Sequence, residues 1–431
     1  MKSPMETIDA YLARKHSELQ LLNGCLRQPH PLPAPRSAGE VIRRKFQLTA
    51  ALKAEHALGD WTGTETAWAD ADQHRAGPFS FSYDYQRADL DVRGPSFYAV
   101  DEGMHETIYT ISGMAAIAAL LLAIRPVLGE AELLMLPGSY GETQELVAAH
   151  ARHLRPATLT GDLADTLVQR SSLPRLLLLD SSATAANFEA VLRCDRPTID
   201  LLMLDTTCFA NGSGRIRRAL GWARRWGMPT VMVRSHTKLD SLGAEYGRLG
   251  SVVFVDWAAA SRASRMQLKD LPSETRNAVR LLGGAALPAH FPPYVGTSGY
   301  RDLTSRRVAA ILRNSRRARR HFAGMLRGLT AELNYAHGLY VTLASRTALD
   351  EAAARRAAAE MSDDLRRAGL PIRHAGSFGF DFAATEWFHD ATTDRYSVRV
   401  AVPDLPTAIW DEMTQSIAGW WSAHQGRSAA A

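Results

Sequence analysis

The sequence predicts an α/β protein whose large domain has a mostly parallel sheet covered by helices, followed by a smaller α+β domain towards the C-terminus. Five short apolar runs carry this prediction, and they lie at 131–137, 175–182, 199–207, 228–235 and 250–257. Helical segments separate them, and strands buried on both faces of a parallel sheet are expected to be continuously apolar. Beyond residue 338, shorter strand-like pieces surround a helical segment at 348–368, which is typical of a smaller mixed domain.

The chain divides into three expected sections. Residues 1–80 form an N-terminal helical and extended arm, interrupted by the proline-rich loop 28–39. Residues 81–290 contain the five apolar runs and form the large α/β domain. Residues 291–431 form the small domain, which opens with a long amphipathic helix at 301–327 whose basic face is solvated.

The composition is that of an ordinary globular protein of 431 residues, with 46% hydrophobic and 22% charged residues. The formal net charge of +5 is small for this length and does not point to a nucleic-acid partner. The longest apolar run, 114–124, is too short to cross a bilayer, and no long apolar core follows the N-terminus as in a signal peptide. We therefore expect no membrane association.

The three cysteines, Cys25, Cys194 and Cys208, form no closely spaced pair. A disulfide framework or a cysteine-based zinc site is therefore not expected, and no other motif for a metal is identified. Low cysteine usage fits a reducing compartment, so the expected localisation is cytoplasmic.

A lysine and an aspartate stand at the ends of two apolar runs. Lys238 lies just beyond the run 228–235, and Asp205 lies near the end of the run 199–207. A partly buried lysine can form a Schiff base with a carbonyl, although a surface lysine is the commoner outcome. A carboxylate at the carboxyl end of a parallel strand points into the crevice where α/β proteins bind ligands, or it caps a turn. Enzymes that use pyridoxal 5′-phosphate (PLP) need this pair, the lysine for the aldehyde and the acid for the pyridine nitrogen.

Several donors could hold the phosphate of such a cofactor. The segment Ser112-Gly113-Met114 opens the expected buried helix, and backbone N–H groups at a helix N-terminus bind anions. Ser235 and Thr237 precede the candidate lysine and carry hydroxyl donors. A plain turn before a helix is the alternative interpretation of Ser-Gly-Met.

Five motifs in chain order resemble the cystathionine γ-synthase / methionine γ-lyase family, the Cys/Met-metabolism PLP enzymes of fold type I. The resemblance covers about residues 80–404. The motifs are a Ser-x-Thr-Lys segment, a Ser-Gly-Met-Ala-Ala phosphate loop, a Tyr-Gly-x-Thr motif, a Tyr-x-Arg motif and an arginine on a late strand. They stand here as Ser235-His236-Thr237-Lys238, Ser112-Gly113-Met114-Ala115-Ala116, Tyr140-Gly141-Glu142-Thr143, Tyr85-Gln86-Arg87 and Arg399.

The resemblance implies a role for each residue of the site. Lys238 would hold PLP as a Schiff base and act as general base, while Asp205 keeps the ring nitrogen protonated. Tyr140 would stack on the ring and move a proton near the leaving group. Arg399, assisted by Ser377, would bind the carboxylate of the substrate.

The Tyr85-Gln86-Arg87 motif implies an assembly of several subunits. In the family this segment reaches the phosphate of a neighbouring subunit, so Tyr85 and Arg87 are expected to complete a partner's cofactor site. The protein is therefore expected to be a homodimer or homotetramer with shared active sites. Its other partner would be a small amino-acid substrate.

The sequence departs from the family pattern in three places. The family's Asp-Asn-Thr-Phe becomes Asp205-Thr206-Thr207-Cys208-Phe209, and the segment 211–225 suggests an inserted helix. The family's Glu-Ser-Pro-x-Asn-Pro is reduced to Asp180-Ser181-Ser182, which leaves Thr184 or Asn187 as candidate partners of the phenolic oxygen of the cofactor. We therefore expect a divergent member whose substrate differs from the methionine-pathway intermediates.

The resemblance implies γ-elimination or γ-replacement on an amino acid, in specialised metabolism. Some relatives expel a γ-halide and form an alkyne, which is one reaction that would suit the divergence. Two alternatives stay open, because one fold hosts several reactions with nearly the same residues. The first is an aminotransferase or a β-lyase, and the second is a PLP-binding regulator without catalytic activity.

Overall fold

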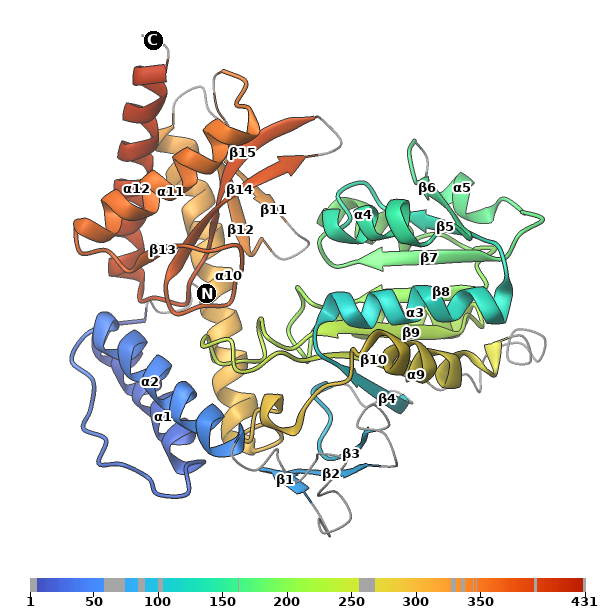
Figure 1. Cartoon of the computed structure of the whole chain (residues 1–431). Coiled ribbons are helices and arrows are strands. Elements are labelled where there is room, and N and C mark those ends of the chain that lie inside the picture. The colour runs from blue at the N-terminus through green and yellow to red at the C-terminus, as the bar shows by residue number, and fades with distance from the viewer. Residues whose placement is uncertain are drawn as a thin grey trace. The chain divides into compact units, whose positions relative to one another are not determined.

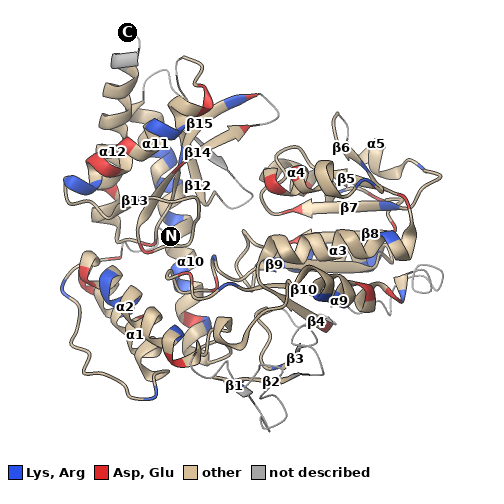
Figure 2. Ribbon diagram, in the orientation of Figure 1, with Lys and Arg blue, Asp and Glu red and all other residues tan. Residues whose placement is uncertain are grey.

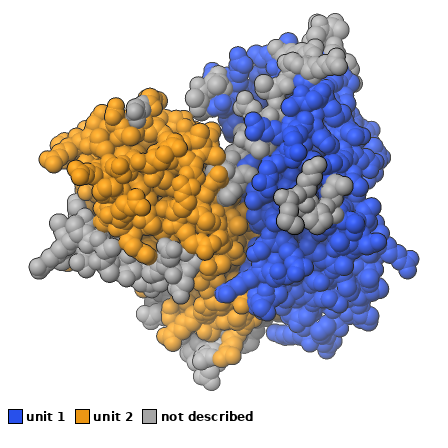
Figure 3. Space-filling model, turned by 180° about the vertical axis from the view of Figure 1, so that it is seen from behind, with its two compact units in different colours: residues 1–52, 241–245, 297–431 blue, residues 53–240, 246–296 orange. Residues whose placement is uncertain are grey.

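A computed structural model describes residues 6–57, 74–83, 90–99, 104–161, 163–255, 268–326, 331–334, 338–343, 345, 347–390 and 394–428. The chain forms two compact units, coloured separately in Figure 3. We call residues 53–240 and 246–296 the large-sheet unit, and residues 1–52, 241–245 and 297–431 the terminal unit. The first 52 residues thus share a unit with the C-terminal part of the chain, a different grouping from the separate arm expected over residues 1–80.

Seven strands form the sheet of the large-sheet unit, in the order β4-β10-β9-β8-β7-β5-β6 (Figure 1). Their bounds are β4 Met104–Thr110, β5 Ala131–Met135, β6 Leu154–Thr158, β7 Arg175–Asp180, β8 Leu201–Asp205, β9 Thr230–Ser235 and β10 Gly250–Val255. Strands β9, β8, β7, β5 and β6 are parallel, whereas β10 runs antiparallel to both β9 and β4. The chain returns from β9 to β10 through a loop, and an antiparallel pair needs no crossover helix. The predicted α/β fold with a mostly parallel sheet is confirmed.

The helices of this unit are α3 Gly113–Leu128, α4 Gly141–His150, α5 Leu163–Val168, α6 Ala185–Val191, α7 Gly214–Arg225 and α9 Leu271–Leu282. Helix α3 is the buried helix expected from residue 112 onward. It contacts β9, β10 and α9, and it buries Ile117, Leu120 and Ile124 in one core with Val233 and Phe254. Helix α7 confirms the helix expected within 211–225. A three-stranded sheet of β1 His74–Ala76, β2 Phe79–Tyr83 and β3 Leu90–Arg93, and the short helix η3 Pro288–His290, also belong to the described part of this unit.

The terminal unit is the smaller α+β assembly. Its sheet has the order β11-β12-β15-β14-β13, and its strands are β11 Ala331–Asn334, β12 Tyr340–Leu343, β13 Ile372–His374, β14 Ala383–Asp390 and β15 Arg395–Ala401. Its helices are α1 Ile8–Gly24, α2 Ala38–Ala57, α10 Ser298–Met325, α11 Glu351–Arg367 and α12 Thr407–Ser428. Helices α10 and α11 are the two helices expected at 301–327 and 348–368. Thr297 and Asp350 begin them as N-caps, each accepting a backbone N–H with its side chain.

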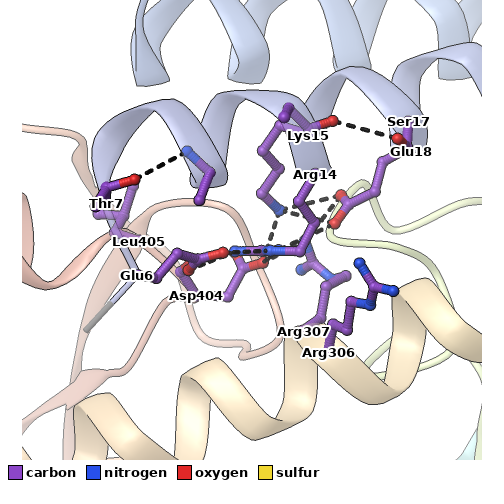
Figure 4. A network of polar contacts seen from close by, with 12 residues as sticks. Glu6, Thr7, Arg14, Lys15, Ser17, Glu18, Arg306, Arg307, Asp404 and Leu405 are labelled. Carbon is purple, nitrogen blue, oxygen red and sulfur yellow. Dashed lines mark hydrogen bonds and ion pairs between the residues drawn. The ribbon is translucent and has the colours of Figure 1, made fainter. Parts of the chain in front are cut away.

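Charged residues of both signs lie along α1 and α10 (Figure 2). Where these helices meet, eight ionisable side chains form what we call the buried-charge cluster, of which Figure 4 shows the greater part. Its members are Glu6, Arg14, Lys15, Glu18, Lys45, Arg307, Asp381 and Asp404. Lys15 Nζ alone lies 3.0 Å from Glu18, 2.6 Å from Asp381 and 2.7 Å from Asp404. Within this cluster four cations meet four carboxylates, and the half-buried Arg313 also pairs with Glu6 at 3.3 Å, so each buried charge has partners of opposite sign.

No helix within the described part of the chain combines the length and the apolar character that crossing a membrane would take.

Candidate active site

The carboxyl ends of three neighbouring strands bring polar residues to one edge of the large sheet. Asp180 ends β7, Asp205 ends β8, and Ser235 ends β9. Asp180 and Asp205 are directly paired in the register of these parallel strands. Ligands of α/β proteins bind outside this edge, because the loops that follow the strands meet there. The edge is therefore the candidate active site.

The start of α3 makes close contact with the end of β9. A Cβ placed on Gly113 would come within 2.8 Å of the Ser235 Cβ, so only glycine permits this approach. A Cβ on Gly250 would likewise overlap the carbonyl of Ser112. Ser112 caps α3, its Oγ accepting the N–H of Ala115 at 3.0 Å. The N-terminus of a 16-residue helix is thereby fixed beside a hydroxyl-bearing strand end, an arrangement suited to an anion.

Two hydroxyl groups lie next to each other at the end of β9. Ser235 Oγ and Thr237 Oγ1 lie 3.0 Å apart, and both side chains are half-buried. Met114, in the first turn of α3, accepts a weak hydrogen bond through its sulfur from Thr143 Oγ1 at 3.9 Å. The structure thus places Gly113, the central residue of the predicted segment from Ser112 to Met114, next to Ser235.

Lys238 lies in the loop after β9, and the residues on both sides of it are fixed. Asp240 accepts two hydrogen bonds from Arg234, from Nε at 2.7 Å and from Nη2 at 2.8 Å. His236 Nδ1 lies 2.8 Å from Asp240, and its Nε2 lies 2.8 Å from Ser251 Oγ on β10. Side-chain hydrogen bonds therefore join Arg234 and His236, which precede Lys238, to Asp240, which follows it. The half-buried Lys238 lies in the turn between them.

Arg234 also holds the segment that follows Asp205. Its Nη1 donates to the carbonyl oxygen of Thr206 at 2.6 Å, and Thr207 Oγ1 accepts the N–H of Ser235 at 3.0 Å. The ends of β8 and β9 are thus tied together by side chains as well as by the sheet. Arg234 was not among the residues predicted from the sequence, although an arginine in a buried strand signals a polar partner.

Asp205 is buried, with 6% of its surface exposed. Burial raises its pKa to about 7, the charge of Asp180 adds to the rise, and the Thr207 N–H and the Arg234 guanidinium act in the opposite direction. Such a carboxylate is stabilised by a cation placed beside it. The protonated ring nitrogen of PLP is a cation of this kind.

Tyr140 precedes α4, and its backbone N–H donates to Asp180 Oδ2 at 2.7 Å. This contact holds Tyr140 at the same edge of the sheet as Asp205. Cys208 lies there too, and its backbone N–H donates to Ser181 Oγ at 3.0 Å. Burial raises the pKa of the Cys208 thiol, with Asp205 and Asp180 adding to the rise and Lys238 opposing it, so this thiol is neutral near pH 7.

The two candidate partners of the phenolic oxygen serve local structure. Thr184 caps α6, its Oγ1 accepting the N–H of Asn187 at 3.2 Å. Asn187 Nδ2 donates to the carbonyl oxygen of Pro137 at 3.5 Å. Neither contact tests the expected role, which stays a prediction.

The expected substrate-binding residues lie in the terminal unit. Arg399, on β15, donates from Nε to Glu386 Oε1 on β14 at 2.8 Å, and its guanidinium lies over the rings of Tyr340 and Phe388 at 4.3 and 4.4 Å. Ser377 is buried in the loop before β14. Glu386, which pairs with the arginine that the resemblance assigns to the substrate carboxylate, was not among the residues predicted from the sequence.

Two expected cofactor residues, Tyr85 and Arg87, lie outside the described residues. The remaining donors of the large-sheet unit fit PLP. The close approach of Gly113 to Ser235 leaves no room for a side chain and sets the N-terminus of α3 beside the Ser235 hydroxyl, the buried Asp205 calls for a cation, and Lys238 supplies the amine.

Comparison with known proteins supports the fold. The sequence matches no protein-family model and no curated protein. Its structure is similar to the crystal structure of cystathionine γ-synthase from Xanthomonas oryzae pv. oryzae in complex with aminoacrylate and cysteine. The TM-score is 0.50 and the sequence identity is 18%. The match covers 74% of this chain and 82% of that one. A structure of the same enzyme in complex with cystathionine gives a TM-score of 0.49 at 18% identity, with the same coverage. At this identity the likeness shows a shared fold, an α/β unit with a mostly parallel sheet and a smaller sheet-containing unit.

Proposed function

We propose that this protein is a PLP-dependent enzyme that acts on an amino acid by γ-elimination or γ-replacement. One observation carries the cofactor assignment: the Ser112-Gly113 helix start, Ser235 and Asp205 meet at one sheet edge, with Lys238 in the adjoining loop. A shared fold with a cystathionine γ-synthase agrees with it.

Each group has a distinct task in this proposal. The N–H groups that open α3, with the Ser235 and Thr237 hydroxyls, bind the phosphate. Asp205 faces the ring nitrogen and Tyr140 the ring. Tyr85 and Arg87 reach the phosphate from a neighbouring subunit of a homodimer or homotetramer.

When bound, PLP supplies an electron sink that makes the Cα proton of an amino acid acidic. The Lys238 amine would take that proton from Cα and pass it on to the bound cofactor, which would return the amine to its free-base form so that it could take a second proton from Cβ. Loss of the Cβ proton is the step that lets a γ-substituent leave with its bonding electrons. Arg399, with Ser377 beside its sheet, holds the substrate carboxylate by charge-assisted hydrogen bonds.

The divergence of the segments that follow β7 and β8 supports a substrate outside the methionine pathway. An amino acid with a γ-halide or another good γ-leaving group is the class we propose, and an alkyne is one product that such chemistry permits.

Proton NMR in heavy water with a panel of β- and γ-substituted amino acids tests the reaction class. Exchange at both Cα and Cβ, with loss of the γ-group, is the expected result. Exchange at Cα alone, with a keto acid that forms only when an acceptor is present, would replace this proposal with an aminotransferase. Loss of a β-substituent without Cβ exchange would replace it with a β-lyase.

A further inference from the structure

Arg234, near the end of β9, is paired across the turn that carries Lys238. The arginine is 1% exposed, and Asp240 accepts hydrogen bonds from its Nε at 2.7 Å and from its Nη2 at 2.8 Å. A contact at two points fixes the relative orientation of the two groups as well as their distance. Lys238 lies between the two partners in the chain, so the pair restricts where the lysine can lie.

The same guanidinium also holds the segment that follows Asp205. Its Nη1 donates to the carbonyl oxygen of Thr206 at 2.6 Å and to that of Phe209 at 2.9 Å. Thr206 is fixed further, because its hydroxyl lies 2.7 Å from the hydroxyl of Tyr98, whose ring centroid lies 5.6 Å from the Arg234 Cζ. One side chain therefore joins the segment after Asp205 to the turn of Lys238.

Stability alone is a weak reason for a buried arginine at this place. A buried ion pair often contributes no more to stability than apolar side chains of similar volume would. A guanidinium has a property that apolar groups lack, since it makes several directional contacts from one rigid plane. Arg234 uses these contacts on both of the segments that carry the expected cofactor residues. The geometry therefore favours a role in positioning.

We propose that Arg234 is a positioning residue that sets the Lys238 amine and the Asp205 carboxylate at the separation that one PLP molecule spans. The inference rests on the proposed function. The aldehyde and the ring nitrogen of PLP stand at opposite positions of the pyridine ring, so both protein groups reach one cofactor only if their segments keep this spacing. In Schiff-base formation the amine gives up two protons, a C=N bond replaces the C=O bond, and the aldehyde oxygen leaves as water. An amine that is held beside the aldehyde favours this step.

Two ligands that differ only at the reacting carbon test the proposal. PLP carries an aldehyde there, whereas pyridoxine 5′-phosphate carries an alcohol and cannot form the Schiff base. The full chain, freed of cofactor, is titrated with each ligand at a temperature where every variant is folded. The ratio of the affinity for PLP to the affinity for the alcohol measures what the Lys238 amine contributes. Other differences between the ligands cancel when this ratio is compared between variants.

Asp240→Asn breaks the contact on the lysine side, because the amide N–H group would face an N–H group of the guanidinium. The affinity ratio should fall by about 10-fold or more, since the amine is no longer held in place. The affinity for the alcohol should not change, because the contacts of Arg234 with Thr206 and Phe209 remain. Arg234→Met releases both segments, so the ratio and the affinity for the alcohol should both fall.

A double variant separates positioning from stability. Asp240→Asn alone leaves a buried guanidinium without the carboxylate that pairs with it, which is strongly destabilising. Arg234→Met combined with Asp240→Asn removes both charges and keeps an acceptor for His236, which contacts Asp240 at 2.8 Å. Its urea midpoint should lie above that of Asp240→Asn, while its affinity ratio should stay low. A ratio that recovers together with the urea midpoint would overturn the inference.

Glu132→Gln is the matched control. The Glu132 carboxylate accepts a hydrogen bond from the Nε of the buried Arg175 at 2.8 Å, and this arginine also donates to the carbonyl oxygen of Thr166 at 2.8 Å. The arrangement is like that of Arg234, but it lies at the start of β5 and β7, at the opposite edge of the same sheet. Whatever its effect on the urea midpoint, this variant should keep the wild-type affinity ratio.

Equal losses of affinity for the two ligands in Asp240→Asn would overturn the inference, because the contribution of Lys238 would then not depend on the pair. An unchanged affinity for the alcohol in Arg234→Met would overturn the part that concerns Asp205. A wild-type protein that binds the alcohol as tightly as PLP, or that binds neither, would overturn the proposed function and the inference with it. If a single variant does not fold, the double variant decides, and a wild-type ratio there would contradict the positioning role.

Discussion

Lys45 Nζ donates a hydrogen bond of 2.8 Å to the carbonyl oxygen of Leu242. Lys45 lies on α2, and Leu242 belongs to the segment 241–245, which begins three residues after Lys238 and forms part of the terminal unit. The next residue, Gly243, has a φ of +87°, and a Cβ there would lie 2.5 Å from Arg307 Nη2. The N-terminal helices, which the resemblance leaves without a role, thus anchor the chain just after the candidate catalytic lysine.

Lys45→Met should destabilise the terminal unit. It leaves Glu18 and Asp381, both buried partners of Lys45, with one cation fewer. Breaking a buried ion pair on one side costs about 3–5 kcal/mol, measurable as a fall in the urea midpoint. Arg366→Met is the control, because its pair with Asp363 is exposed and is worth at most about 1 kcal/mol. Equal shifts of the urea midpoint in both variants would contradict a stabilising role of Lys45 in the buried-charge cluster.

Lys238→Ala should abolish covalent attachment of PLP. The expected result is loss of the adduct that borohydride fixes on this lysine, read by mass spectrometry of the peptide, with activity reduced by about 10²–10⁴-fold or more. Lys269→Ala, at an exposed lysine of the same unit, should keep the adduct. An adduct that survives in Lys238→Ala would mean that another lysine holds the cofactor.

Gly113→Ala should weaken PLP binding by about 10- to 100-fold, because the added Cβ would push Ser235 away at an overpacking cost of about 1–3 kcal/mol. Fluorescence titration with PLP measures the affinity. Gly141→Ala provides the comparison, since a Cβ there meets nothing within 4 Å. An unchanged affinity in Gly113→Ala would place the phosphate elsewhere.

Arg399→Ala should raise the KM for the amino acid by about 10- to 150-fold while PLP stays bound, because a charge-assisted hydrogen bond contributes about 1.5–3 kcal/mol. Glu386→Gln should lower KM, since the carboxylate that now pairs with Arg399 would no longer compete with the substrate. Steady-state kinetics and the visible absorption of bound cofactor give both quantities. Loss of cofactor from Arg399→Ala would show that this arginine is structural.

The terminal unit should lose stability in acid. Burial alone would raise the pKa of Asp404, but Arg307, Lys15 and Arg14 lower it to about 2. A carboxyl group with a lowered pKa in the folded state stabilises the fold above its unfolded pKa, and this contribution is lost as the pH falls through about 4 towards 2. Thermal unfolding between pH 5 and pH 2 should therefore show a steep fall, and Asp404→Asn should flatten that slope while lowering stability at pH 7.

Lys15 gives a pH dependence of the same sign in a higher pH range. Burial and the neighbouring Arg307 lower its pKa to about 8, against the attraction of Asp381, Asp404 and Glu18. The unfolded chain therefore binds its proton more tightly than the folded one, so this residue's contribution to stability rises as the pH increases through about 8 towards 10.5. In Lys15→Met that rise in the unfolding free energy should be absent.

Local sequence was sufficient to predict the buried helix α3, the α+β character of the C-terminal part and five of the seven strands of the large sheet, all but β4 and β6. Continuous apolar runs such as that of β8 are a property of neighbouring residues, and burial on both faces leaves few other solutions. Ser112-Gly113 and Ser235 could be assigned to one site, because strand ends and helix starts of an α/β fold meet at the same edge.

Tertiary structure alone decided which charges are neighbours. Asp180 stands beside Asp205 only through the register of β7 and β8, and Glu386 reaches Arg399 only through the pairing of β14 with β15. The buried-charge cluster joins Lys15 to Asp404 across 389 positions of the chain. Such contacts depend on strand pairing and helix packing between distant segments, which no local pattern specifies. The sequence by itself determined which chemical groups are present.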